Sequence, residues 1–206
     1  MSRGHDTISE RAFFFFIAYI YYFSKQVIHV PSNTNAYTNK MEEILKVLDK
    51  ESIRISIPLR GKYPLIKDWV NYKEKRTIAQ ILSKDNLGLR TGTKPWKDYY
   101  FCVLDIDGKG WTKIISNQRI SYVRTAKGIH IYLKIKGQEI PSNGILYSQG
   151  KRTGDFCSKG KQVVGIGSTH ETGDIYRLVK RGKWFWKLES IEELKERLKK
   201  HEIELR

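Results

Sequence analysis

The stretch that most constrains the fold is residues 99–108, YYFCVLDIDG. Six apolar residues, rich in aromatic and branched side chains, are followed by two acids and closed by Gly108. An apolar run this short, ending at a glycine, predicts a buried strand rather than a helix. The chain is therefore expected to fold around a strand whose last residues are charged.

The two acids of this strand, Asp105 and Asp107, are two residues apart and so project from the same face. Like charges held close together are costly unless a cation lies between them, and oxygen ligands suit Mg²⁺ or Mn²⁺. The same residues also occur in ordinary turns, because Asp and Gly end strands and begin hairpins. Taken alone, the DxDG pattern leaves a metal site and a turn both open.

Composition points to a folded protein with a polyanionic partner. The 206 residues fit one domain with appendages, and 40% of them are hydrophobic. Lys and Arg number 38 against 22 acids, a net charge of +16, which favours nucleic acid as the partner over a basic surface that binds nothing. Cys102 and Cys157 form no CxxC pair, so the sequence predicts neither a disulfide framework nor a zinc site and suits a reducing, cytoplasmic location.

The first 40 residues differ from the rest. Residues 12–23 form an apolar run of twelve, shorter than the roughly 20 that span a bilayer, so no stable membrane partner is expected. Three interpretations stay open: a signal peptide, a packing or anchoring helix, or an extension upstream of a true start at Met41. The third is favoured, because MEEILKVLDK has acids in the first turn of a predicted helix.

The predicted organisation is an extension over 1–40, a main domain over 41–189 and an amphipathic helix over 190–206 that opens with the capping box Ser190 to Glu193. Within the main domain, Pro58 and Pro64 predict extended chain with a turn at Gly61. A short helix is expected at 77–84, and a strand followed by a Gly-bounded turn at 86–92. After Gly108 we expect a turn and then strands at 120–123 and 129–135, a loop at 140–150, and strands at 162–166 and 175–179.

A histidine lies in the second of the long predicted strands, GIHIYLKI. The apolar side chains at 129, 131, 133 and 135 share one face, and His130 shares the other with Tyr132 and Lys134. If the core takes the apolar face, His130 points outward. A histidine on a strand is more often structural than functional, but this polar face makes His130 a candidate for contacting phosphate.

Two common catalytic motifs are missing. Residues 154–161, GDFCSKGK, have five residues between the glycines where a P-loop has four, and Gln162 replaces the required Ser or Thr. No GxSxG pattern occurs, and the sequence shows no Ser or Cys partner for its histidines.

Four blocks in order carry a resemblance: NLGLRTG, VLDIDG, VRTAKGIHIYL and GDFCSKGKQVVGIGSTHETGDIYRL. Together, over about residues 57–178, they resemble the catalytic domain of the primase-polymerase (prim-pol) family of archaeal plasmids and phages, in the archaeo-eukaryotic primase superfamily. The resemblance implies an α+β fold with a mixed or antiparallel central sheet, flanking helices and an RRM-like catalytic core. It makes residues 41–189 the catalytic domain.

The resemblance also implies roles for single residues. Two divalent ions, Mg²⁺ or Mn²⁺, would be bound by Asp105, Asp107 and a third acid, Asp155. His130 would contact the phosphates of the incoming nucleotide. Ser168 and His170, which match the family's Ser-x-His turn, would also bind the nucleotide. Charge on the phosphates would be neutralised further by Lys161, and by Arg90 or Lys127. Some relatives bind zinc between the second and third blocks, but residues 136–152 contain no cysteine, so no zinc is expected.

The function implied is template-directed nucleotidyl transfer, as a DNA primase or polymerase in plasmid or viral replication. Partners would be template and primer DNA, nucleoside triphosphates and a separate helicase or replication protein. Two alternatives remain: a DNA-binding replication initiator that has lost synthesis, and a metal-dependent nuclease. The clustered acids argue against the first, because a surface that only binds DNA gains nothing from carboxylates.

Overall fold

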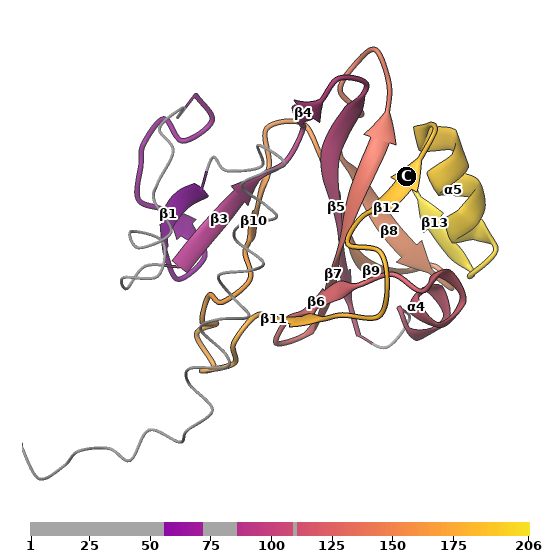
Figure 1. Cartoon of the computed structure of the whole chain (residues 1–206). Coiled ribbons are helices and arrows are strands. Elements are labelled where there is room, and N and C mark those ends of the chain that lie inside the picture. The colour runs from indigo at the N-terminus through magenta and orange to yellow at the C-terminus, as the bar shows by residue number, and fades with distance from the viewer. Residues whose placement is uncertain (1–55, 72–85, 109–110) are drawn as a thin grey trace, which may run out of the picture. The chain divides into compact units, whose positions relative to one another are not determined.

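The computed structural model describes residues 56–71, 86–108 and 111–206, of which strands form the largest part (Figure 1). The extension over 1–40, the helix predicted from Met41 and the helix predicted at 77–84 all lie outside these residues. No helix in the described ranges is both long enough and apolar enough to span a bilayer.

The larger sheet has the strand order β11-β6-β7-β5-β9-β8-β13, with β12 beside β7 and β4 beside β5. Neighbouring strands are antiparallel except β12 and β7, which are parallel, so the sheet is mixed. Its strands are β4 (Thr93–Trp96), β5 (Tyr99–Asp107), β6 (Tyr122–Arg124), β7 (Gly128–Lys136), β8 (Gly144–Ser148), β9 (Lys151–Cys157), β11 (Arg177–Val179), β12 (Trp186–Leu188) and β13 (Ile203–Leu205).

The smaller sheet has the order β10-β3-β1-β2 and is antiparallel throughout. It consists of β1 (Ser56–Arg60), β2 (Tyr63–Pro64), β3 (Asn86–Arg90) and β10 (Gln162–Val164). The predicted turn at Gly61 is confirmed: it joins β1 to β2 with a φ of 61°, a backbone conformation that glycine adopts without strain.

Strand β5 is buried on both faces, which explains its uninterrupted apolar sequence. Phe101 and Val103 belong to one hydrophobic cluster, here called the first cluster, which also contains Tyr132 of β7 and residues of the smaller sheet such as Leu89 and Val163. The smaller sheet therefore packs on this face of β5.

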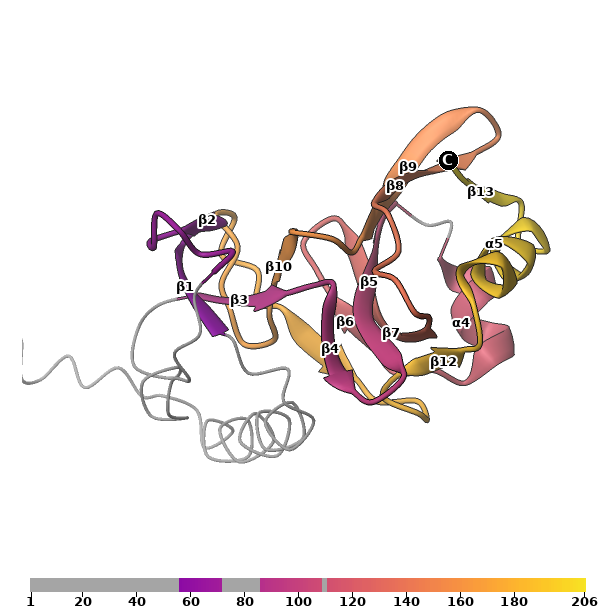
Figure 2. The same ribbon diagram turned by 90° about the horizontal axis from the view of Figure 1, so that it is seen from above.

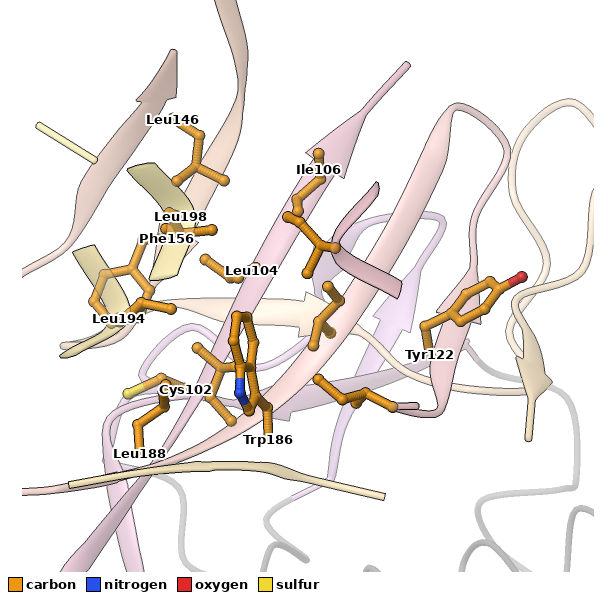
Figure 3. Packing of buried hydrophobic residues seen from close by; sticks show 14 of the residues in the cluster. Cys102, Leu104, Ile106, Tyr122, Leu146, Phe156, Trp186, Leu188, Leu194 and Leu198 are labelled. Atoms are coloured by element: carbon orange, nitrogen blue, oxygen red, sulfur yellow. The ribbon is translucent and has the colours of Figure 1, made fainter. Parts of the chain in front are cut away.

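The opposite face of β5 contributes Cys102, Leu104 and Ile106 to a second cluster. Two helices complete this cluster, α4 (Thr112–Gln118) and α5 (Ile191–Lys199), and both lie on one side of the larger sheet (Figures 1 and 2). Figure 3 shows Leu194 and Leu198 of α5 beside Phe156 and Leu104.

Several sequence predictions hold, and three need correction. The mixed, mostly antiparallel sheet is confirmed, whereas the flanking helices and RRM-like core stay a prediction. Residues 140–150 are not only a loop, because β8 forms there and pairs with β9 and β13. Residues 112–118, predicted as part of a turn and strand region, form α4, whose Ile114 and Ile115 are buried in the second cluster.

The C-terminal helix is shorter than predicted. Ser190 caps it as expected, since its hydroxyl accepts a hydrogen bond from the Glu193 amide. The helix ends at Lys199, Glu202 has a positive φ of 63°, and β13 follows. Pairing with β8 buries Ile203, and a continued helix would forfeit that pairing.

We expect Leu104→Ala to lower the free energy of unfolding by about 2–5 kcal/mol, because it leaves a cavity in the second cluster. Ile140→Ala, at a position that is 39% exposed, should cost far less. Chemical denaturation of both variants measures this difference, and equal losses would contradict the central position of β5.

Candidate active site

Three adjacent strands, β7, β5 and β9, place the predicted acids and histidine side by side. In the strand register, Asp105 of β5 lies opposite His130 of β7 and opposite Asp155 of β9. Asp107 follows two residues later on the same face of β5, and this face is also that of Phe101 and Val103. The structure therefore brings together all four residues predicted to be catalytic.

Glycines flank the acidic end of β5 on both sides. Gly128 of β7 lies opposite Asp107, and Gly154 of β9 lies opposite Ile106. A Cβ atom at Gly128 would collide with the carbonyl of Ile106, and one at Gly154 with the carbonyl of Asp105. Close approach of the three backbones at this point thus depends on the absence of side chains at both positions.

His130 is buried, so the prediction that it points outward is wrong. Its side chain is 5% exposed, because the first cluster and Tyr176 cover the face that was expected to meet solvent. Its Nε2 lies 3.4 Å from Oδ1 of Asp105, whose side chain is 40% exposed. Its Nδ1 is buried and has no hydrogen-bond partner among the described residues. The buried side chain of His130 therefore contacts a partly exposed carboxylate, that of Asp105.

The two acids of β5 have pKa values shifted in opposite directions. Burial by itself raises the pKa of Asp105, but the charge and hydrogen bond of His130, together with the charge of Lys62, outweigh this and lower it. The pKa of Asp107 is raised, by burial first and then by the negative charge of Asp105, although Lys127 opposes the shift. Asp155 also raises the pKa of Asp107, which shows that all three carboxylates influence one site.

Asp155 has a cationic partner in its own strand, Arg152. Nη2 of Arg152 lies 2.8 Å from Oδ1 and 2.7 Å from Oδ2 of Asp155, and both side chains are about half exposed. Thr153, between them, hydrogen-bonds through its hydroxyl to the Asp107 carbonyl at 3.3 Å. In this conformation, the guanidinium group of Arg152 occupies both oxygens of Asp155.

The predicted Ser-x-His turn is linked to His130 through the ring of Tyr176. The hydroxyl of Ser168 accepts a hydrogen bond from the Leu87 amide in β3, and Nδ1 of His170 contacts the Thr172 hydroxyl at 2.9 Å. Tyr176 packs its ring against both histidines, with ring centroids 5.6 Å from His130 and 6.4 Å from His170. Burial and the nearby acids raise the pKa of Tyr176 to about 12, so the phenol stays neutral.

Of the predicted phosphate-binding cations, Lys127 lies near the acids, whereas Arg90 and Lys161 belong to the smaller sheet or adjoin it. Lys127 precedes β7 and is exposed, close enough to Asp107 to lower its pKa. Arg90 ends β3, where its guanidinium donates to the carbonyl of Val70. Lys161 is exposed next to β10, and its carbonyl accepts a hydrogen bond from the Thr91 amide. Their predicted role in binding nucleotide stays a prediction.

The side chains around the acids fit a divalent metal ion by their chemistry. Three carboxylates on neighbouring strands, two of them about 40% exposed, offer the hard oxygen ligands that Mg²⁺ and Mn²⁺ prefer. As they stand, no three His, Cys, Asp or Glu side chains in the described ranges are arranged to enclose an ion. In this conformation, both carboxylate oxygens of Asp155 are hydrogen-bonded to Arg152.

Three residues of the site were missed by sequence reasoning. These residues are Lys62, Arg152 and Tyr176. Lys62 and Tyr176 approach the site through packing between distant segments, whereas Arg152 pairs with Asp155 within β9. For Arg152, the spacing of three residues from Asp155 was a signal, but a strand alternates its faces and does not predict an i to i+3 contact. Lys62 and Tyr176 had no comparable signal.

Comparison with known proteins decides the family. The family described as "Bifunctional DNA primase/polymerase, N-terminal" (Prim-Pol) matches residues 45–196, which include every residue of the site. The chain belongs to the Prim-Pol family. A search among curated proteins found no match. Prim-Pol membership implies an enzyme of the nucleotidyltransferase type that acts in DNA replication and binds DNA and nucleotides.

The raised pKa of Asp107 has a consequence for stability. A group whose pKa is raised by folding contributes stability below its unfolded pKa of about 3.9, and this contribution is lost as the pH rises through the folded value. We therefore expect Asp107→Asn to melt at a higher temperature than the wild type at neutral pH without divalent ions. The difference should shrink towards pH 4, as thermal melts over a pH series would show. A variant less stable than the wild type at pH 7 would contradict mutual repulsion of the acids.

Proposed function

We propose that the chain is a template-directed DNA primase/polymerase that transfers nucleotides with the help of two divalent ions, in the replication of a plasmid or virus. One observation carries the proposal: Asp105, Asp107, Asp155 and His130 share one face of three adjacent strands inside the Prim-Pol match. Template and primer DNA, nucleoside triphosphates and a separate helicase or replication protein are the proposed partners.

Asp105, Asp107 and Asp155 would hold the Mg²⁺ or Mn²⁺ ions. When bound, such ions lower the pKa of a primer 3′-hydroxyl and neutralise the triphosphate and the leaving pyrophosphate. A cation here would also relieve the repulsion that raises the pKa of Asp107. The three carboxylates thereby exchange mutual repulsion for attraction to the ions.

The other residues of the site would position these acids and the nucleotide. His130 holds Asp105 through Nε2 and is the largest favourable influence on its carboxylate, so in the protonated state it would bring positive charge towards nucleotide phosphates. Lys127, Lys161 and Arg90 would neutralise further phosphate charge. Ser168 and His170 would keep the turn behind His130 in place, with Tyr176 between the two rings.

Replacing either acid of β5 tests this assignment. Asp105→Asn and Asp107→Asn should each reduce metal-dependent nucleotide incorporation more than about 100-fold, because groups outside a metal's ligand shell already cost 10–100-fold when lost. DNA affinity should persist, since phosphate contacts supply it. Extension of a labelled primer on a template with Mg²⁺ or Mn²⁺ and nucleotides is the measurement.

Asp98→Asn is the matched control, because Asp98 is an exposed acid just before the other end of β5. Full incorporation by Asp105→Asn or Asp107→Asn would refute the assignment. The same assay separates the alternatives, because a nuclease shortens the labelled strand and a DNA-binding initiator leaves it unchanged.

The ion pair of Arg152 provides a second test, with binding as the readout. Arg152→Gln frees both oxygens of Asp155 and removes a positive charge, so Mn²⁺ should bind several-fold more tightly. The Mn²⁺ concentration that gives half of the maximal rise in melting temperature measures this affinity. Arg206→Gln is the control, since it breaks an equally exposed ion pair with Glu204. Unchanged or weaker Mn²⁺ binding in Arg152→Gln would remove Asp155 from the proposed ligands.

A further inference from the structure

A basic cavity lies apart from the acids, at the edge of the larger sheet where β12 pairs with β7. Its volume is about 640 Å³, within the range of pockets that hold small ligands. Residues of α4, of the segment before β12 and of α5 surround it, and no acid is among the lining residues. Its cations are Arg119, Arg181, Lys183, Lys187 and Arg197.

Three of these five cations have no acidic partner in the part of the chain that the structure describes. Lys187 pairs with Glu189 at 3.5 Å, and Arg197 pairs with Glu193 at 2.6 Å. Arg119, Arg181 and Lys183 are exposed and form no ion pair with a described carboxylate. Their mutual repulsion at one cavity is a cost that an anionic ligand would remove.

Two loops hold these three cations in place, and a buried serine connects the loops. The Ser121 hydroxyl accepts a hydrogen bond from the Arg181 amide at 3.2 Å and donates one to the Gly182 carbonyl at 3.1 Å. The Ser121 amide bonds to the Lys183 carbonyl at 2.8 Å, and Gly182 packs so closely on Arg119 that a side chain would not fit. The cations therefore lie on a fixed frame rather than on independent loops.

The cavity lies at the β12 edge of the sheet, and its lining residues come from the helical side and from the side that holds the acids. Trp186, which lines the cavity, belongs to the second cluster with α4 and α5, and Figure 3 shows it in that layer. Phe185, the preceding lining residue, belongs to the first cluster, on whose face Asp105 lies. Phe185 and Trp186, which follow each other at the start of β12, thus bring the two faces of the sheet together at this cavity.

We infer that this cavity binds backbone phosphates of a DNA strand outside the catalytic site, as a second anchor for the template. The inference rests on the proposed function for the identity of the ligand. Arg119, Arg181 and Lys183 contact the phosphates, and Phe185 and Trp186 form the apolar floor. The anchor holds the template while the acids act on the nucleotide.

The test is the salt dependence of DNA affinity. A labelled single-stranded oligonucleotide is titrated with the full chain over a series of salt concentrations, without nucleotide or divalent ion, and anisotropy is recorded. In the triple variant Arg119→Gln, Arg181→Gln, Lys183→Gln, the slope of log affinity against log salt should fall in magnitude by about 2, at roughly 0.7 for each lost phosphate contact.

The control is the triple variant Lys151→Gln, Lys195→Gln, Lys199→Gln, which removes the same charge from exposed positions outside the cavity. It should keep a slope close to that of the wild type. Equal slopes in the two triple variants, whether lowered or not, would overturn the inference.

A second variant guards against misfolding. Arg119→Lys with Arg181→Lys preserves the charge and should retain the wild-type slope. A lowered slope there would mean that loop structure matters and charge does not, which also counts against a phosphate site. Because binding is measured without catalysis, an inactive acid cluster would defeat the proposed function and leave this result unaffected.

Discussion

The structure depends on the position of β5, which is hydrogen-bonded to a long strand on each side and buried on both faces. A strand held in this way cannot slip by one residue, because a slip would move every apolar side chain to the opposite cluster. The backbone of Asp105 is consequently fixed. Beyond the buried run 100–104, the side chains of Asp105 and Asp107 reach solvent.

The smaller sheet determines the environment of the acids. The chain passes between the two sheets from β3 to β4 and again from β9 to β10, so both sheets share one continuous cluster around Phe101 and Tyr132. This packing buries His130 and places the turn with Lys62 near Asp105. An imidazole held in the interior has less rotational freedom than an exposed histidine, so its Nε2 stays 3.4 Å from Oδ1 of Asp105 at little further entropic cost.

Sequence reasoning found the elements whose signal is local. The apolar run before Asp105 and the alternation around His130 identified the two central strands and the face that each residue shares. The burial of His130 was not predicted, because alternation shows which residues share a face of a strand but not which segments cover that face. The contacts of Lys62 and Tyr176 were not predicted either, because they depend on packing between segments that are distant in the chain. β8 was missed because Pro141, Asn143 and Gly144 suggest a loop, although pairing with β9 extends the chain there.

The site gathers three carboxylates in a chain whose net charge is +16. Asp105 and Asp107 are two residues apart, yet their pKa values shift in opposite directions. The charge and hydrogen bond of His130 lower the pKa of Asp105, whereas burial and the negative charges of Asp105 and Asp155 raise the pKa of Asp107. On acidification, Asp107 therefore accepts a proton before Asp105 does, and the pair loses negative charge in steps. A divalent cation would oppose this protonation, because it favours the ionised form of all three acids. The excess of cations elsewhere, with a net charge of +16, favours a polyanionic partner, whereas the three acids form a negatively charged site among the described residues.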